Sequence, residues 1–502
     1  MGKIITTIQN RFDGGMVNSL LGARENECAT MLHFDATTDP HILRPLKSTT
    51  SNITGQVGVG QLLVGADGLF YGLGTISSNG TIYKKATYAG DWAELGSGTS
   101  RSGAGVEYSL FVEYRNYFFY WKAGFLGKYD RVGVASSDPT FVTLSWSTVR
   151  TNGIIHPKDD ILYIPYDNKI GKLNTAAGAT PVTGDWTAAA LTLPVNLVIT
   201  AIAPYGNYLA IACAPLNGSP TQGSIIYLWD RDSSLATLSE NINWGNNIIR
   251  VLNNLNGVLI GISDMGTTSE SLYESKLQIK GWNGGFVFEK EFISKSETSA
   301  SASVTIYPRV NFIYDNKMYF SADVQSAEPR KRGLWTIKQN RFGAHIVSVE
   351  RVGTTSNSDT VAVLAAAIIG DRMLTVYTSA GTIDITTSTA SAAYGTSTCV
   401  TRIFNDGDSS SIKKLIGITL MSTPLISTAG IDVYYRKDEE TAWTLIFSHT
   451  VDNSISYSAI NIESSGATLP QFKEIQFQIK ASGGAEITGW KFKSEFIDKD
   501  IY

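Results

Sequence analysis

The feature that most constrains the fold of this chain is a repeat of about fifty residues. Seven segments share a short apolar strand, a polar turn and a second apolar strand: "LLVGADGLFYG", "FVEYRNYFFYW", "IIHPKDDILYI", "AIAPYGNYLAIA", "VLNNLNGVLIGI", "NFIYDNKMYFSA" and "AAAIIGDRMLTVY". The second turn residue recurs every 44 to 59 residues, at Gly68, Asn116, Asp160, Asn207, Gly257, Asn316 and Asp371. Many of these turn residues tolerate positive φ, as tight hairpin turns require, so each segment is predicted to be a β-hairpin.

A third apolar segment follows each hairpin and is usually preceded by glycine. Its equivalent positions are Ile82, Leu126, Ile170, Ile226, Leu277, Leu334 and Ile383. The related stretches "GDWAEL" from Gly90 and "GDWTAA" from Gly184 indicate outer-strand turns in two of the copies. Each repeat is therefore predicted to be a unit of three or four antiparallel strands.

Sheets this small cannot cover both of their faces with their own side chains. Radial stacking lets each sheet bury a face on the next, and the ring leaves short, protected edges. A linear solenoid usually has a shorter and more regular period, whereas the outer loops of a propeller absorb variation in length. We expect an all-β chain with a β-propeller of about seven blades over residues 57–395, and six or eight blades also fit the spacing.

Beyond residue 395 the pattern changes to strands that alternate with period two. In "EIQFQIKA", Ile475, Phe477 and Ile479 point one way while the intervening polar side chains point the other. Several such strands at intervals of about ten residues predict a β-sandwich over residues 396–502, with one packed and one solvated face.

The first 56 residues contain no hairpin repeat and are predicted to be a separate leader. In "NRFDGGMVNS", Gly14 and Gly15 permit a reversal of the backbone that other residues would resist. Phe12 and Met16 would then fix the leader to the ring or to a neighbouring subunit; alternatively, the turn only starts the first domain. The following "NSLLGARENECATMLHFDA" has weak helical periodicity.

The two ends of the chain together resemble a tailed-bacteriophage virion protein. The leader carries Phe12, Gly14 and Gly15, then Phe34 and Asp35, and finally Leu43, Arg44 and Pro45, and the sandwich carries "DVYYRKDEETAWTLI". Where the related pattern often has an acidic residue, this chain has Asn18. The resemblance implies a tail- or neck-associated structural protein, with Phe12, Gly14, Gly15, Phe34, Asp35 and Pro45 as its docking and leader motif.

Recognisable catalytic and metal-binding motifs are missing from the sequence. The five histidines are scattered and are interpreted as loop or surface residues, and three distant cysteines predict reduced thiols. The adjacent Asp159 and Asp160 are better explained by a turn than by an acid–base pair. A net charge of -4 gives no field for nucleic acid, and the basic run Arg330–Arg332 is interpreted as a solvated loop.

From these features we expect a virion structural protein, assembled in the host cytoplasm, that works by protein–protein docking and is not an enzyme. Several copies would surround a symmetry axis and contact other virion proteins, and we expect no cofactor, metal, nucleic acid or membrane insertion. One alternative is a propeller at the tail tip that binds a receptor or a host-surface glycan, since ten Trp and 23 Tyr suit sugar stacking. A second is a polysaccharide-degrading propeller enzyme.

Overall fold

The computed structural model describes residues 4–497 except for a set of short segments. These are residues 18–25, 48, 52–58, 77–78, 86–91, 96–102, 105, 123, 133–135, 145–147, 217–222, 233–237, 266–273, 296–302, 326–330, 341–342, 352–361, 371, 378–382, 387–393 and 461–469. Within the described residues the regular elements are strands, apart from a 3₁₀ turn at Thr183–Asp185. None of the described elements is a helix that could span a membrane.

The chain divides into two units, which are described separately. The propeller unit comprises residues 49–333 and 359–388, and the sandwich unit comprises residues 1–48, 334–358 and 389–502. The sandwich unit therefore draws on three parts of the sequence, and the chain leaves the propeller unit within β30 (Lys331–Gln339).

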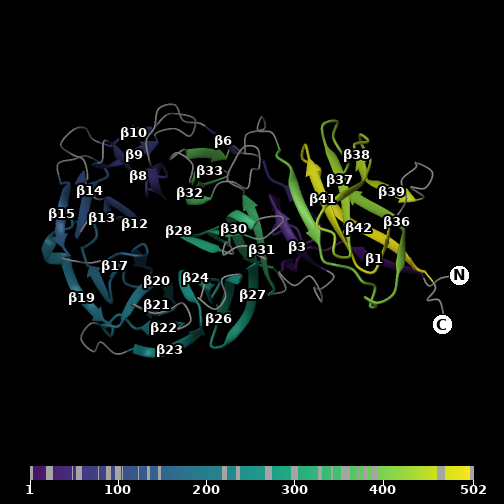
Figure 1. The fold of residues 1–502 in the computed structure, drawn as a ribbon. Helices are drawn as coiled ribbons and strands as arrows, with labels where there is room; N and C mark the ends of the chain where they lie inside the picture. Colours follow the sequence, from purple (N-terminus) through teal and green to yellow (C-terminus); the bar gives the residue numbers. More distant parts are fainter. Residues whose placement is uncertain are drawn as a thin grey trace. The chain divides into compact units, whose positions relative to one another are not determined.

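The propeller unit contains successive antiparallel sheets in sequence order (Figure 1). The first two sheets are β7 (Val59–Val64), β8 (Phe70–Ile76), β9 (Asn79–Lys85), β10 (Trp92–Glu94) and β11 (Gly103–Ala104), then β12 (Val106–Tyr114), β13 (Tyr117–Lys122), β14 (Phe125–Asp130) and β15 (Asp138–Thr143). The next two are β16 (Ile154–His156), β17 (Ile161–Tyr166), β18 (Lys169–Leu173) and β19 (Trp186–Thr192), then β20 (Leu197–Tyr205), β21 (Tyr208–Pro215), β22 (Ser224–Trp229) and β23 (Leu238–Gly245).

The remaining sheets of this unit complete a ring. They contain β24 (Ile248–Leu255), β25 (Val258–Met265), β26 (Glu274–Trp282) and β27 (Phe286–Lys295), the hairpin β28 (Val304–Tyr314) and β29 (Lys317–Val324), and β32 (Val363–Ile369), β33 (Arg372–Tyr377) and β34 (Ile383–Thr386). The first strands of neighbouring sheets touch from β16 through β20, β24, β28 and β32 to β7 and β12. The ring closes between the second and third blades, where the N–H of Phe111 on β12 donates to Asn152 Oδ1, just before β16, at 3.0 Å. These strands surround a common axis, so the unit is a β-propeller with seven hairpin-based blades among its described residues.

The ring is closed by a strand from far away in the sequence. β6 (Thr49–Ser51) pairs antiparallel with β34, so Asp384 lies opposite Ser51. Figure 1 shows this meeting as a purple strand beside the green strands of the last blade. Residues 49–51, which the sequence pattern assigns to the leader, thus supply the outer strand of the seventh blade.

The predicted repeat agrees closely with the observed hairpins. The residues predicted for the third strand all lie in strands, and those whose burial is described are fully buried: Ile82, Leu126, Ile170, Ile226, Leu277 and Leu334. Both central residues of the turns Arg115–Asn116, Asn256–Gly257 and Asp315–Asn316 have positive φ. This is the backbone geometry of tight hairpins that match the strand twist. Asp371 lies outside the described residues.

The sandwich unit contains two packed sheets. One has the order β1 (Ile4–Gln9), β42 (Ile487–Phe496), β36 (Lys413–Ser422) and β39 (Ser456–Ile460), with β40 (Gln471–Phe472) also on β36. The other runs from β30 through β31 (His345–Arg351), β3 (Glu27–Leu32), β35 (Ser397–Thr401), β41 (Ile475–Ser482) and β37 (Gly430–Lys437) to β38 (Thr444–His449). The short strands are β2 (Gly15–Met16) on β3, and the pair β4 (Phe34–Asp35) and β5 (Arg44–Pro45).

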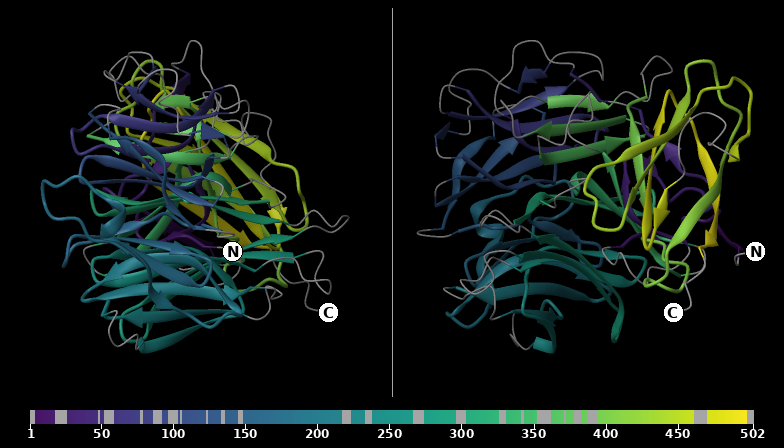
Figure 2. Two further views of the ribbon diagram at one scale, coloured as in Figure 1. Left: turned by 90° about the vertical axis from the view of Figure 1, so that its left-hand side faces the viewer. Right: turned by 45° about the vertical axis from the view of Figure 1, so that its right-hand side comes forward.

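Aromatic side chains join the two sheets of the sandwich. The ring of Phe477 on β41 lies 5.2 Å from that of Phe492 on β42, and Phe404 lies 4.6 Å from Phe492. Figure 2 shows the purple N-terminal strand running with the yellow strands of this unit, which is the pairing of β1 with β42. The C-terminal sandwich predicted from the alternating pattern is therefore present, and the leader is built into it.

The structure corrects three details predicted from the sequence. The weak helical pattern fails because residues 27–32 form the strand β3, which lies between β31 and β35. The predicted solvated face of β41 is buried at Gln476 and Gln478. Burial of Gln476 is tolerated because its amide donates to Thr401 O at 2.7 Å and accepts from Arg436 Nε at 2.8 Å.

The basic run is also not a solvated loop over its described residues. Lys331 and Arg332 begin β30, and Lys331 is buried. Arg332 makes two contacts with Asp323 Oδ2, at 2.7 Å from Nε and 2.6 Å from Nη2. Arg330 lies outside the described residues. The run of cations was misleading because an ion pair joins Arg332 to Asp323 on the neighbouring strand β29 and holds this segment in the sheet.

Candidate functional site

The predicted leader motif is part of the interior of the sandwich unit. Phe12 is completely buried, and its ring lies 5.4 Å from that of Trp490. Its backbone N–H donates to Pro40 O at 2.7 Å. Met16 is also buried and lies opposite Cys28 in the parallel pair of β2 and β3. The described partners of Phe12 therefore fasten the leader to the C-terminal sandwich of the same chain.

The Gly14–Gly15 turn is required by a close approach of two backbones. Gly15 has a φ of +67°, and a Cβ there would lie 2.7 Å from Val347 N and 2.9 Å from Val347 O. A Cβ on Gly14 would meet the side chain of Glu27 and the carbonyl of Asn26. The two glycines thus let the turn lie directly against β31 and the start of β3. Asn18 lies outside the described residues.

The second half of the motif forms a small structural turn. Phe34 is buried and pairs with Pro45, while Asp35 pairs with Arg44. The Asp35 carboxylate accepts hydrogen bonds from the backbone N–H of Thr37 at 2.8 Å and of Thr38 at 3.1 Å. Asp35 therefore holds the turn after β4. The side chains of Phe12 and Phe34 are not available to a partner in this structure.

A different set of polar side chains links neighbouring blades of the propeller. In the first hairpin turn, Asp67 Oδ2 accepts from Tyr71 Oη at 2.9 Å and pairs with Arg131 Nη1 of the second blade at 2.9 Å. Arg131 Nε also lies 2.6 Å from Oε1 of Glu113. Glu113 completes the link because its other oxygen accepts from the backbone N–H of Ala66 at 2.7 Å.

The same arrangement recurs between the third and fourth blades. Asp159 Oδ2 accepts from Tyr163 Oη at 2.8 Å and pairs with Arg231. The adjacent Asp160 turns the other way and pairs with Arg115 of the second blade at 2.7 Å. Asp159 and Asp160 thus lie in a turn, as predicted, and each stabilises a different blade junction.

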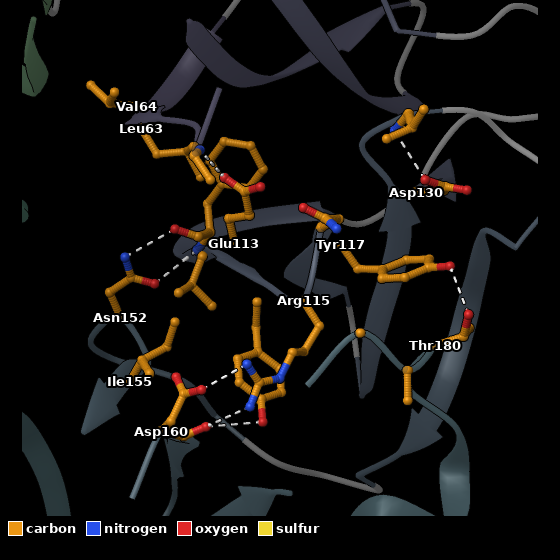
Figure 3. Close-up of a pocket in the computed structure, with 18 residues that line it drawn as sticks. Leu63, Val64, Glu113, Arg115, Tyr117, Asp130, Asn152, Ile155, Asp160 and Thr180 are labelled. Carbon is orange, nitrogen blue, oxygen red and sulfur yellow. Dashed lines mark hydrogen bonds and ion pairs between the residues drawn. The ribbon is translucent and has the colours of Figure 1, made fainter. Parts of the chain in front are cut away.

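Glu113, Arg115 and Asp160, three of the linking residues, line a cavity of about 790 Å³ over the first three blades. Figure 3 shows Arg115 extending toward Asp160, with Glu113, Asn152 and Tyr117 around the same space. Burial raises the pKa of Glu113. Burial and the adjacent Asp67 carboxylate raise the pKa of Tyr71 to about 12. The carboxylates named here are held by arginines, so their geometry is suited to joining blades.

Four of the five histidines are buried: His33, His156, His345 and His449. His33 lies in a loop, but the other three lie in β16, β31 and β38, so the prediction of loop or surface residues is wrong for those three. His156 shows why, because its Nε2 lies 3.1 Å from Tyr208 O and its Nδ1 accepts from Lys158 N–H at 3.2 Å. Burial lowers the pKa of His156, which favours the neutral ring. Among the described residues no group of three His, Cys, Asp or Glu side chains is arranged to hold a metal ion.

The three cysteines are free and buried, and two of them meet. Cys28 on β3 and Cys399 on β35 have their sulfur atoms 3.3 Å apart, although 371 positions separate them in the chain. Burial raises the pKa of the Cys399 thiol well above its ordinary value. The Cys399 thiol is thus protonated at neutral pH and poorly reactive.

Sequence reasoning missed the blade-linking network although a signal was present. An Asp precedes a Tyr by four residues in two hairpins, at Asp67 and Asp159, and an aromatic-Asp-Arg triplet ends the third strand of the following blade, at Arg131 and Arg231. Each short pattern has the same internal spacing in its two copies. The ion pair between the Asp and the Arg could not be inferred from the sequence, because it joins one repeat to the next.

The fold and these linkages define a β-propeller protein with an attached β-sandwich. No protein-family profile matches the chain, and no curated protein is similar to it in sequence.

Several solved structures are similar to this chain at low sequence identity. The N-terminal domain of Nup159 has a TM-score of 0.41 at 9% identity, with 71% of this chain and 99% of that one covered. PorZ of the type-IX secretion system of Porphyromonas gingivalis has a TM-score of 0.41 at 10% identity, covering 89% and 60%. An exo-β-1,3-galactanase from Phanerochaete chrysosporium has a TM-score of 0.29 at 13% identity, covering 89% and 99%.

Proposed function

We propose that this protein is a non-enzymatic structural component of a tailed-phage particle, in its tail or neck apparatus, that acts by docking to other virion proteins. The proposal starts from the leader and sandwich motifs that resemble such proteins. The observation that carries it in the structure is the exposed edge strand β1. An edge strand that is held by a rigid sheet can bind a partner with little loss of conformational entropy.

Strand β1 lies at the end of its sheet and pairs with β42 alone among the described strands. Its isoleucines Ile4 and Ile8 are 57% and 49% exposed, whereas Phe12, just beyond its end, is buried. An edge strand presents unpaired backbone groups that another chain can extend, and exposed apolar side chains favour such an addition. Charged residues, the usual protection of such edges, do not occur within β1.

The occupant that we propose is an extended segment of a neighbouring virion subunit, which adds a strand to β1. This mode depends on main-chain hydrogen bonds and apolar contacts, in keeping with the small net charge of -4. It also gives the buried leader motif a role, because Phe12 and Gly15 hold the chain in place directly after the docking strand. Several copies around a symmetry axis would repeat the same contact. The receptor-binding and polysaccharide-degrading alternatives remain predictions.

Mass spectrometry of purified virions tests the location, and a paired substitution tests the surface. The double variant Ile4→Lys/Ile8→Lys should fold normally yet be lost from particles, because edge lysines oppose strand addition. Val195→Lys is the matched control, since Val195 is 85% exposed on the propeller unit. Absence of the wild-type protein from virions would refute the proposal. Normal incorporation of the double variant would refute the role of β1.

A further inference from the structure

A second cavity, of about 640 Å³, lies on the axis of the propeller. It is lined by residues of the first strands of five blades and by the segment just before β16: Ser109, Val149, Arg150, Thr151, Thr200, Arg250, Tyr307, Pro308, Arg309 and Leu364. Because the first strands surround the axis, a ligand here would contact most of the ring at once. This site is independent of the docking proposed above.

Five of the ten lining residues occupy equivalent positions in the repeat. Ser109, Thr200, Arg250, Arg309 and Leu364 each lie seven residues before the second turn residue of their hairpin. At each of them the pairing register with the next strand shifts, as between Ile249 and Val251 around Arg250. A β-bulge takes a residue out of the regular alternation and redirects its side chain. Repeated bulges thus direct one side chain from each of these blades to the cavity.

Three arginines make the cavity cationic: Arg250 and Arg309 at the repeated positions, and Arg150 in the segment just before β16. Arg150, Arg250 and Arg309 line it, and no acidic residue does. Nε of Arg250 pairs with Asp264 Oδ1 at 2.9 Å, and Arg309 Nη1 donates to Gly60 O at 3.0 Å. These contacts hold the two guanidinium groups in place, and even with Asp264 counted the charges sum to a positive value.

Two further groups in the cavity have hydrogen-bonding capacity to spare. The side chain of Arg150 is exposed, and it has no ion pair or hydrogen bond to the residues that the structure describes. The Oγ atom of Ser109 is buried and has no hydrogen-bond partner among the residues that the structure describes. A buried hydroxyl without a partner is costly unless a ligand or water satisfies it.

We propose that the axial cavity binds a small oxyanion, a carboxylate or a phosphate, with Arg150 as its principal contact and Ser109 as a hydrogen-bond donor. The planar fork of arginine matches both carboxylate and phosphate oxygens. A cavity that is lined by positive charges and has low-dielectric walls focuses its electric field and attracts an anion. The volume lies within the range of small-molecule sites, about 300–1,000 Å³.

Isothermal titration calorimetry of the full chain tests this site, with citrate in one arm and inorganic phosphate in the other at constant ionic strength. We expect one of the anions to bind, and the arm that responds identifies the ligand class. Arg150→Gln should weaken binding by about tenfold or more, because it removes charge-assisted hydrogen bonds. Lys158→Gln removes the same charge from an exposed turn of the third blade and should leave binding unchanged.

A second variant separates ligand binding from folding. Ser109→Ala should weaken binding a few-fold without lowering the melting temperature, since Ser109 Oγ has no described partner to lose. Binding of neither anion at millimolar concentrations would overturn the proposal. Equal losses in Arg150→Gln and Lys158→Gln would overturn it as well, because the effect would then be one of overall charge.

Discussion

The two units of this protein are assembled from opposite kinds of contact. In the propeller unit, a strand pairs with the next strand along the chain, and β6 with β34 is the long-range exception among the described pairs. In the sandwich unit, β1 pairs with β42 and β3 pairs with β35. The propeller is therefore built from strands that are neighbours in the sequence, while the sandwich requires three distant segments of the chain to pair with one another. The comparison predicts that leader substitutions should affect one unit and spare the other.

The largest expected effect is that of Phe12→Ala, which removes a ring buried against Trp490. The cavity should reduce the opening free energy of the sandwich unit by about 3–5 kcal/mol. Hydrogen exchange measured by mass spectrometry should show faster exchange in β41 and β42 with unchanged protection in β20 and β21. Phe286→Ala, at a half-exposed ring of the propeller, is the control. Equal loss of protection in both units would contradict the comparison.

The next effect concerns Lys331 in the propeller unit. Burial lowers its pKa to about 8 from an ordinary 10.5. Between these values the unfolded chain binds more protons than the folded chain, so the free energy of unfolding should rise as the pH rises through this window. Lys331→Met removes the buried charge and should stabilise the protein at pH 7 by on the order of 3 kcal/mol.

Denaturant unfolding between neutral and alkaline pH measures this effect. The pH dependence from Lys331 should be absent from Lys331→Met and present in Lys158→Met, where the lysine is exposed. A variant that keeps the wild-type slope would show that Lys331 does not titrate in this way.

A smaller difference is expected between two glycines with similar backbone angles. Gly15 and Gly178 have φ values of +67° and +77°, but a Cβ would collide with Val347 at Gly15 and would meet nothing at Gly178. Gly178→Ala should cost about 1–2 kcal/mol from the backbone alone. Gly15→Ala should cost about 2–3 kcal/mol because the leader must also move away from β31. Equal melting temperatures for the two variants would show that the close approach is not important.

The smallest effect is one of reactivity. Native protein treated with a thiol reagent should label slowly at Cys28, Cys399 and Cys213, because all three are buried and the pKa values of Cys213 and Cys399 are raised by burial. Denaturation should expose three thiols. Rapid labelling of Cys28 in the native protein would indicate that the leader detaches from β35. The sandwich unit would then not protect its distant strand pairs as this prediction requires.

The propeller could be predicted from the sequence because its information is local. Turn residues such as Asn116 and Gly257 and the apolar residues after them recur with the period of the blade. The candidate sites could not be predicted in the same way. Arg131 meets Asp67 and Glu113 only across a blade junction, and the cationic cavity requires bulges to bring Arg250 and Arg309 to one axis.

The sequence by itself determined the strands, the turns and their repetition, since hairpin geometry depends on φ preferences and on alternation within a few residues. Only the tertiary structure decided where the leader lies. Phe12 meets Trp490 across almost the whole chain, and Cys28 meets Cys399 across 371 positions. Such contacts depend on the register of strands from distant segments, and no short-range pattern specifies that register.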